Sequence, residues 1–182
     1  MIDKNPPERI ENGCWSSKTS SDPENIRETV ILEASKRGLT ICAAESCTGG
    51  LLGGALTETP GSSSTFLGSA VCYSNDAKIR VLGVSPDLIS MHGAVSAECA
   101  AAMAAGARRL FGADISCAVT GVAGPGGGSH EKPVGLVWFS IETPWESGLF
   151  FRIYPGGREE IRRRSVVEAL ETIIRSIKRQ FP

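Results

Sequence analysis

Ala43-Ala44-Glu45-Ser46-Cys47-Thr48-Gly49-Gly50 is the stretch of this sequence that decides the fold. A short apolar run, Leu39 to Ala44, leads into it, and a second one, Leu51 to Leu56, follows it. This order predicts a strand that turns into a helix, with two hydroxyls and a thiol at the rim of a sheet. The amides at a helix N-terminus point at whatever binds in such a place. The stretch therefore predicts either a nucleophile or an anion-binding loop.

The composition is that of one globular protein without a strong charge. The chain has 182 residues, of which 41% are hydrophobic, and its net charge is −1. One domain can bury a core of that size, and the small net charge gives no general attraction to nucleic acid or anionic membranes. No apolar run approaches the roughly 20 residues that span a bilayer, and the first residues lack the apolar core of a secretory signal. We therefore expect a cytoplasmic protein.

The six cysteines form no recognisable metal-binding or disulfide pattern. None falls in a C-x-x-C pair, which argues against a zinc site. Cys42, Cys72 and Cys117 lie inside apolar runs that are typical of strands. We interpret them as small buried hydrophobic residues in a reducing compartment rather than as disulfide partners.

The order of the segments predicts a tail followed by one domain. Residues 1–22 are rich in proline, serine and charged residues, which is typical of a disordered tail. Asp22 and Pro23 are a good N-cap and first-turn pair for a helix that ends at Gly38. Residues 23–182 then form the single folded domain.

Apolar periodicity and turn residues predict the elements of that domain. Strands are expected at about 39–44, 68–73, 115–120, 134–141 and 148–154, and further helices at about 49–57, 75–82, 86–92, 96–111 and 158–179. The gap between the last two strands is too short for a parallel crossover, so that pair should be antiparallel. The pattern predicts an α/β fold: a three-layer α/β/α sandwich with a mixed, mostly parallel sheet.

Four polar clusters stand out from this pattern, at residues 45–50, 73–78, 121–132 and 155–158. The first three follow the carboxyl ends of predicted strands, and the fourth opens the last helix. In open α/β sheets those strand ends share one rim, where ligands bind. The common placement predicts that the clusters contribute to one site.

Ser46 is a candidate nucleophile that needs a base. A serine hydroxyl reacts poorly unless another group takes its proton, and the two histidines, His92 and His130, have no obvious carboxylate partner. A buried lysine can be the base, directly or through a tyrosine hydroxyl, and Tyr73 and Lys78 lie together in the second cluster. The residues thus indicate a Ser46–Tyr73–Lys78 group. The alternative is that Ser46 caps the helix, Tyr73 packs and Lys78 is solvated.

Other residues of the clusters have two interpretations each. Cys47 is a rival nucleophile if a helix N-terminus stabilises its thiolate, but a buried structural thiol is the better interpretation. Thr48 could donate its hydroxyl to an anionic ligand or cap the helix. Arg158 could form a bidentate contact with a phosphate or be a solvated helix residue. The three arginines at positions 162–164 are interpreted as a solvated or subunit-facing helix surface.

The most glycine-dense segment, residues 120–129, matches neither the P-loop nor the dinucleotide-binding pattern. This argues against a nucleoside triphosphatase or a dinucleotide-dependent enzyme. Its glycines would still let backbone amides approach a phosphate closely. The alternative is a flexible loop, and the residues that follow, His130 to Lys132, are expected to be exposed.

Several motifs occur in one order along the chain: AESCTGG at 44–50, PGSS at 60–63, YSNDAK at 73–78, HGAVS at 92–96, TGVAGPGG at 120–127 and EKPVG at 131–135. Together they resemble the C-terminal domain of the competence/damage-inducible protein CinA family, over about residues 24–180. No segment resembles the molybdopterin-binding-like N-terminal domain of that family, so the chain is similar to its stand-alone form.

The resemblance implies a nicotinamide-nucleotide amidohydrolase, which converts nicotinamide mononucleotide and water to nicotinate mononucleotide and ammonia in pyridine nucleotide salvage. The serine, tyrosine and lysine proposed for the family correspond to Ser46, Tyr73 and Lys78. The resemblance implies no metal and no other cofactor, and it favours a homodimer. The family commonly has Gly-Asp-Arg where this chain has Gly156-Gly157-Arg158, so a carboxylate that could orient Arg158 is missing.

In the implied mechanism, Lys78 is neutral and accepts the Ser46 proton directly or through Tyr73, and amides from Thr48 to Gly50 stabilise the oxyanion. The expected substrate-binding residues are Thr48, Gly49, Gly50, Gly121, Gly124, Gly126 and Arg158, the last four for the 5′-phosphate and ribose. Two other classes stay open. One is a non-catalytic nucleotide-binding regulatory module linked to competence or DNA damage. The other is a DNA-associated factor, which the nearly neutral charge argues against.

Overall fold

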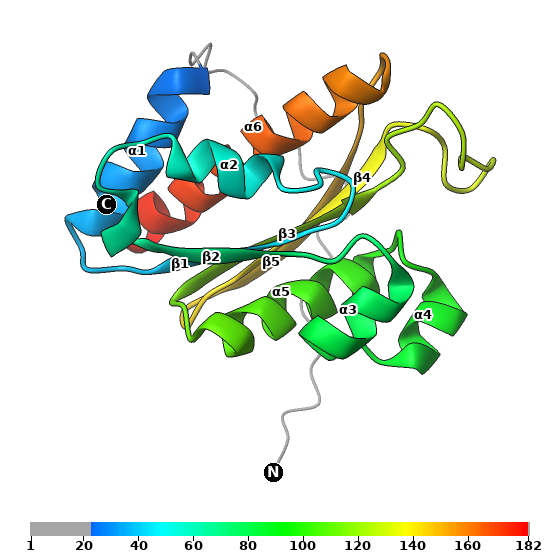
Figure 1. The fold of residues 1–182 in the computed structure, drawn as a ribbon, viewed down its shortest axis with the longest axis horizontal. Coiled ribbons are helices and arrows are strands. Elements are labelled where there is room, and N and C mark those ends of the chain that lie inside the picture. The colour runs from blue at the N-terminus through cyan, green and yellow to red at the C-terminus, as the bar shows by residue number, and fades with distance from the viewer. Residues whose placement is uncertain (1–22, 182) are drawn as a thin grey trace.

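A computed structural model of the protein describes residues 23–181. The predictions for residues 1–22, among them the disordered tail, the Asp22 cap and Cys14, lie outside the described residues. Within the described range, five strands form one sheet that is covered by helices on both faces (Figure 1). This confirms the predicted three-layer α/β/α architecture.

The elements follow the predicted order closely. The helices are α1 (Pro23–Ser35), α2 (Leu51–Thr57), α3 (Asn75–Leu82), α4 (Pro86–His92), α5 (Ala97–Phe111) and α6 (Arg158–Gln180), with a short 3-10 turn, η1 (Ser62–Ser64). The strands are β1 (Ile41–Glu45), β2 (Phe66–Val71), β3 (Ile115–Gly121), β4 (Leu136–Glu142) and β5 (Ser147–Ile153). Each helix in the described part of the chain is too short or too polar to cross a membrane.

The sheet has the strand order β2-β1-β3-β4-β5. Strand β1 is parallel to both of its neighbours, whereas β4 is antiparallel to β3 and to β5. Four strands therefore run in one direction and β4 runs against them, which confirms the mixed, mostly parallel sheet and the late hairpin. Every residue of β1 is buried, as expected for a strand with parallel neighbours and helices on both faces.

The two faces of the sheet carry separate apolar cores. Helices α1, α2 and α6 cover one face, and α3, α4 and α5 cover the other (Figure 1). Alternate residues of β1 point into the two cores: Ile41 and Ala43 into the first, Cys42 and Ala44 into the second. The strand thus ends with Glu45 and Ser46 at the boundary between the two layers.

Small residues let α5 lie close to its neighbours. Its buried face is made of Cys99, Ala100, Met103, Ala104, Gly106 and Ala107. A Cβ at Gly106 would lie 2.1 Å from the carbonyl oxygen of Leu82, at the end of α3. Glycine is therefore required there by the close approach of α3, and this brings the start of α3 to the rim of the sheet.

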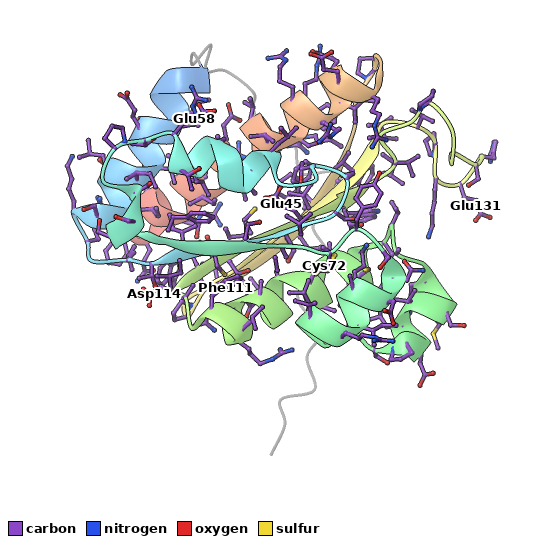
Figure 2. All side chains as sticks on the ribbon, in the orientation of Figure 1. Glu45, Glu58, Cys72, Phe111, Asp114 and Glu131 are labelled. Carbon is purple, nitrogen blue, oxygen red and sulfur yellow. The ribbon has the colours of Figure 1, made fainter. Side chains whose placement is uncertain are left out.

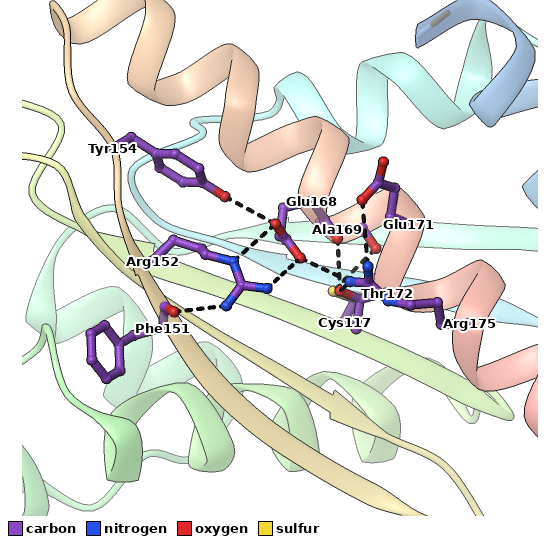
Figure 3. A network of polar contacts seen from close by, with 9 residues as sticks. All are labelled: Cys117, Phe151, Arg152, Tyr154, Glu168, Ala169, Glu171, Thr172 and Arg175. Carbon is purple, nitrogen blue, oxygen red and sulfur yellow. Dashed lines mark hydrogen bonds and ion pairs between the residues drawn. The ribbon is translucent and has the colours of Figure 1, made fainter. Parts of the chain in front are cut away.

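The long helix α6 is held on the sheet by apolar and polar contacts. The predicted stripe of Val166, Leu170, Ile173 and Ile177 is buried. Figure 3 shows the polar part, centred on Glu168. Its carboxylate accepts hydrogen bonds from Arg152 of β5 at 3.2 and 3.3 Å and from Arg175 of α6 at 2.8 Å. These contacts fix the helix, and with it the arginines of its first two turns.

Candidate functional site

The carboxyl ends of β1, β2 and β3 meet at one edge of the sheet, where an open pocket of about 220 Å³ lies. Residues from all four polar clusters contribute to it, as the sequence predicts. The lining consists of Ser46, Cys47, Tyr73, Asn75, Lys78, Ala94, Val95, Thr120, Gly121, Ala123 and Arg158.

Lys78 and Ser46 are in direct contact in this pocket. The Nζ atom of Lys78 lies 3.0 Å from Ser46 Oγ, 2.9 Å from the carbonyl oxygen of Cys72 and 3.4 Å from that of Tyr73. Lys78 is 1% exposed and is the largest fully buried side chain among the described residues. The alternative of a solvated Lys78 is therefore wrong.

Local structure places both residues. Ser74 caps α3 by accepting a hydrogen bond from the Ala77 amide at 3.1 Å, so Lys78 lies in the first turn of that helix. The Ser46 amide donates to the carbonyl of Val119 in β3 at 3.0 Å, which ties the nucleophile candidate to the central strands.

Burial lowers the pKa of Lys78 below its ordinary value of 10.5, because an ammonium is poorly solvated in this environment. A neutral amine has two N–H donors and one lone pair. Two carbonyls and one hydroxyl surround Nζ, so a neutral amine can donate to both carbonyls and accept the proton of Ser46. The site can therefore generate a serine nucleophile without histidine.

The hydroxyl of Tyr73 is hydrogen-bonded to Arg158, whereas a proton relay would need it between Ser46 and Lys78. Tyr73 is 60% exposed, and its hydroxyl accepts a hydrogen bond from Arg158 Nη2 at 2.9 Å. The Tyr73 group that Lys78 contacts is the backbone carbonyl. Of the two routes that the sequence left open, the direct transfer from Ser46 to Lys78 fits the contacts better.

Arg158 bridges two of the loops around the pocket. Its Nη1 donates to the carbonyl of Gly124 at 2.9 Å while Nη2 donates to Tyr73. Gly157 is the N-cap of α6 and supplies no side-chain cap. The guanidinium is thus oriented by a carbonyl and a phenol, and no carboxylate in the described residues forms an ion pair with it. Its positive charge is free to bind an anion.

Glu45 is a residue of the first cluster for which the sequence suggested no role. It is fully buried beneath α2 (Figure 2), and its carboxylate accepts the amides of Gly50, Leu52 and Gly53 at 2.8 to 3.1 Å. The hydroxyl of Ser69 in β2 donates to the same carboxylate at 2.6 Å. The positive end of the helix is therefore neutralised internally.

This arrangement corrects the prediction for the amides after Ser46. The Gly50 amide is engaged by Glu45, and the Gly49 amide donates to the carbonyl of Ser46 at 3.1 Å. Neither is free to bind an oxyanion. The amides of Cys47 and Thr48, in contrast, donate to no oxygen within residues 23–181. The acceptor beside them is the Cys47 sulfur, which is a weak one.

The side chain of Thr48 is fully buried and does not line the pocket. Its hydroxyl has no partner among the described residues, and the N-cap of α2 is Gly50 rather than Thr48. The structure therefore does not bring the Thr48 hydroxyl to the pocket, which corrects its prediction as a group that binds the substrate.

Arg162 corrects the interpretation of the arginine run. Its Nε donates to the carbonyl of Cys47 at 3.1 Å and its Nη2 to that of Thr48 at 2.8 Å. Arg163 and Arg164 are exposed and pair with Glu160, as expected for a solvated surface. The available signal was spacing, because Arg162 lies four residues after Arg158 and so on the same face of the helix.

Cys47 lines the pocket, but its thiol is not activated. Burial raises its pKa to about 12, so it carries no thiolate at neutral pH. The five cysteines in the described residues, Cys42, Cys47, Cys72, Cys99 and Cys117, are free and buried. The preference for buried thiols over disulfides is confirmed for these five.

The glycine-dense loop contributes unevenly. Gly121 lines the pocket, Gly124 binds Arg158 through its carbonyl, and Gly126 is exposed and outside the lining. Lys132 is half-buried rather than exposed, and its ammonium donates to the carbonyl of His92 at 2.6 Å. This contact holds the loop against the segment that joins α4 to α5.

That segment supplies part of the pocket wall that the sequence did not indicate. The hydroxyl of Thr120 donates to the carbonyl of Ala94 at 2.8 Å, and Ala94 and Val95 line the pocket. Small apolar residues carry no chemical signal in a sequence. Among residues 23–181, no group of three or more His, Cys, Asp and Glu side chains could hold a metal ion.

Comparison with known proteins adds to this geometry. A family model described as the CinA C-terminal domain matches residues 23–177. The CinA-like protein of Acidobacterium capsulatum is 43% identical over 169 residues, which cover 93% of this chain and 41% of that protein. The CinA-like protein of Geobacter metallireducens is 47% identical over 161 residues, which cover 87% and 38%. The chain thus spans well under half the length of these curated relatives.

Solved structures with the same fold match over nearly their whole length. A competence/damage inducible protein from Agrobacterium tumefaciens has a TM-score of 0.83 at 43% identity, covering 89% of this chain and 99% of that one. A CinA superfamily protein from Klebsiella pneumoniae has a TM-score of 0.84 at 30% identity, covering 87% and 99%.

Proposed function

This chain belongs to the CinA C-terminal domain family, and we propose that it hydrolyses the carboxamide of nicotinamide mononucleotide to give nicotinate mononucleotide and ammonia. The observation that carries this proposal is the 3.0 Å contact between Lys78 Nζ and Ser46 Oγ inside a buried site. A serine activated by a lysine is suited to attack on an amide carbon. The identity of the nucleotide rests on the family resemblance.

The first chemical step uses Lys78 as a general base. Its neutral amine takes the Ser46 proton while Ser46 Oγ forms a bond to the carboxamide carbon, and the carbonyl oxygen becomes an oxyanion. The lowered pKa of Lys78 makes the neutral form accessible. The proposed donors to the oxyanion are the amides of Cys47 and Thr48, which donate to no oxygen in the described residues.

The second half of the reaction reverses the proton transfer. The carbon–nitrogen bond breaks, and the leaving amide nitrogen takes the proton from the Lys78 ammonium and departs as ammonia. Water then attacks the acyl-enzyme with Lys78 again as the base, which releases nicotinate mononucleotide and restores Ser46. No redox change occurs, and each proton taken by Lys78 is returned.

Arg158 is the proposed partner of the 5′-phosphate. Its guanidinium faces the pocket with no ion-pair partner in the described part of the chain, and its two hydrogen bonds go to neutral groups. An arginine fork of this kind suits a phosphate. Gly121 lines the same pocket and supplies backbone close to the ligand.

The decisive experiment is ammonia release from nicotinamide mononucleotide by the purified protein and its variants. We expect turnover by the wild type and by Cys47→Ala, and none by Ser46→Ala or Lys78→Ala. An active Ser46→Ala variant would exclude the serine mechanism, and an inactive Cys47→Ala beside it would assign the reaction to the thiol.

A non-catalytic nucleotide-binding module is distinguished in the same preparation. Calorimetric binding of the mononucleotide by the wild type, without any ammonia release, would replace the enzymatic proposal with that function. Binding together with turnover supports the enzyme. A lack of both excludes this nucleotide as the ligand.

A further inference from the structure

Arg162 holds the backbone that directly follows the proposed nucleophile. Its guanidinium donates two hydrogen bonds from one edge, Nε to the Cys47 carbonyl at 3.1 Å and Nη2 to the Thr48 carbonyl at 2.8 Å. The contacts span 115 and 114 residues of sequence. A planar guanidinium fixes two acceptors at once in a way that a lysine ammonium does not.

Peptide geometry turns this contact into a constraint on an amide. In a trans peptide the carbonyl of one residue and the N–H of the next lie in one plane and point in opposite directions across the C–N bond. Because Arg162 holds the Cys47 carbonyl, the Thr48 N–H of the same trans peptide points in the opposite direction, away from Arg162. That N–H is one of the two amides that donate to no oxygen in the described residues.

The rest of the turn is fixed independently. The Thr48 carbonyl also binds Arg162, and the Gly49 N–H of the same peptide donates to the Ser46 carbonyl at 3.1 Å. Gly49 has φ +59°, and a Cβ there would lie 3.3 Å from Arg162 Nη2, so glycine suits both the backbone and the arginine. Farther along, Glu45 engages the Gly50 amide.

We propose that Arg162 is a positioning residue for the oxyanion that forms when Ser46 attacks a carbonyl carbon. It acts through the Cys47–Thr48 peptide, whose N–H it orients. Its charge also polarises that peptide, because a charge-assisted hydrogen bond to a carbonyl strengthens the N–H on the other side. This inference rests on the proposed serine mechanism but not on the identity of the nucleotide.

The first test compares Arg162→Ala and Arg162→Lys with Arg163→Ala. The control residue is the next one on α6 and forms a surface ion pair with Glu160. Removing one oxyanion donor costs about 100- to 1000-fold in kcat, and we expect a kcat loss of about 10- to 100-fold for Arg162→Ala because the amide remains but is misaligned. The KM should stay within about twofold, since the interaction acts on the transition state. Arg162→Lys should be intermediate and Arg163→Ala unchanged.

Chemical rescue separates positioning from a structural role. Guanidinium ion added at low millimolar concentration should restore part of the kcat of Arg162→Ala, with no effect on the wild type or on Arg163→Ala. Circular dichroism and thermal unfolding measure the folded fraction of each variant, and each rate is calculated per folded molecule. Wild-type kcat in folded Arg162→Ala, or a loss confined to KM, would overturn the proposal.

A second substrate separates this proposal from that of the nucleotide. Para-nitrophenyl acetate acylates an active serine through the same kind of oxyanion and needs no nucleotide contact. Release of para-nitrophenol above the Ser46→Ala background should fall in Arg162→Ala and not in Arg163→Ala. If para-nitrophenol release falls in this way but the wild type releases no ammonia from the mononucleotide, the role of Arg162 is supported and the proposed substrate is excluded. Equal rates in both arginine variants would remove the role of Arg162, and a wild type that reacts with neither compound would remove both.

Discussion

At the scale of single residues, Lys78 combines burial with a task that needs the neutral amine. The nearby groups are two backbone carbonyls and the Ser46 hydroxyl, and none of them is a carboxylate that would stabilise the ammonium. Burial therefore lowers the pKa of Lys78. The same property that destabilises the charged side chain makes it usable as a base.

We expect kcat/KM for amide hydrolysis to rise with pH along a limb set by the pKa of Lys78, below 10.5. Lys78→Arg should be inactive at every pH, because a guanidinium stays protonated. The check is a pH–rate profile of the wild type and of Lys78→Arg. The control is Lys36→Arg, at an exposed lysine just after α1. Activity that persists in Lys78→Arg would assign the base to another group.

Stability should depend on pH through the same residue. The folded pKa of Lys78 is lower than the unfolded one, so between the two values the unfolded state binds more protons and unfolding becomes harder as pH rises. Below the folded pKa the full cost of burying the ammonium is present. We expect the wild type to gain stability relative to Lys78→Met as pH rises through this interval, measured by urea unfolding. A difference that is independent of pH would contradict the lowered pKa.

At the scale of elements, the N-terminus of α6 lacks a side-chain cap, and a capping residue there would stabilise the helix. Gly157 is its N-cap at φ −87°, with open space where a Cβ would lie, whereas Gly156 has φ +108° and a Cβ there would lie 3.2 Å from Glu160 Cγ. An aspartate at 157 would cap the helix and favour its positive end. An aspartate at 156 would be strained in the left-handed region.

We therefore expect Gly157→Asp to stabilise the protein by about 0.3 to 1 kcal/mol, a rise of roughly 1 to 4 °C in Tm. Gly156→Asp should lower Tm. Differential scanning calorimetry of the two neighbouring variants checks the prediction, and a lower Tm for Gly157→Asp would show that the start of α6 does not accept a capping carboxylate.

The Glu168 cluster between α6 and β5 is a second test at this scale. The Glu168 side chain is 14% exposed and pairs with two arginines. Glu168→Gln removes the charge and should cost about 1 to 2 kcal/mol, because the half-buried Arg152 loses its carboxylate partner and Arg175 loses one of its partners while Glu171 remains. Glu160→Gln, which breaks only solvent-exposed ion pairs on the same helix, should cost clearly less. Chemical denaturation compares them, and equal costs would show that burial does not strengthen the cluster.

At the scale of the whole molecule, the pocket depends on four loops that only the folded sheet brings together. A ligand that binds the folded state alone raises the free energy of unfolding by about 2.7 kcal/mol at 100 times its Kd, or roughly 5 to 10 °C in Tm. We expect this shift for nicotinamide mononucleotide with Ser46→Ala, which does not consume it. The riboside, which lacks the phosphate, and Ser46→Ala combined with Arg158→Ala should both give smaller shifts. An equal shift with Arg158→Ala would remove that residue from the phosphate site.

The homodimer and the cytoplasmic location stay predictions, since the structure describes one chain. Sedimentation of the purified protein decides the first.

Sequence alone determined the order of the elements, the mixed sheet and the gathering of the polar clusters at one rim. These features depend on local periodicity, capping residues and short connections, which are all written within a few neighbouring positions. Ser46 and Lys78 could be proposed as partners because both follow strands that end at the same edge. Only the tertiary structure decided which groups around them are free. Glu45 takes the amides of α2, and Arg162 takes the carbonyls of Cys47 and Thr48. The Glu45 contacts are close in sequence but depend on the burial of its side chain beneath α2, and the Arg162 contacts span 115 and 114 residues and depend on how α6 packs against the sheet.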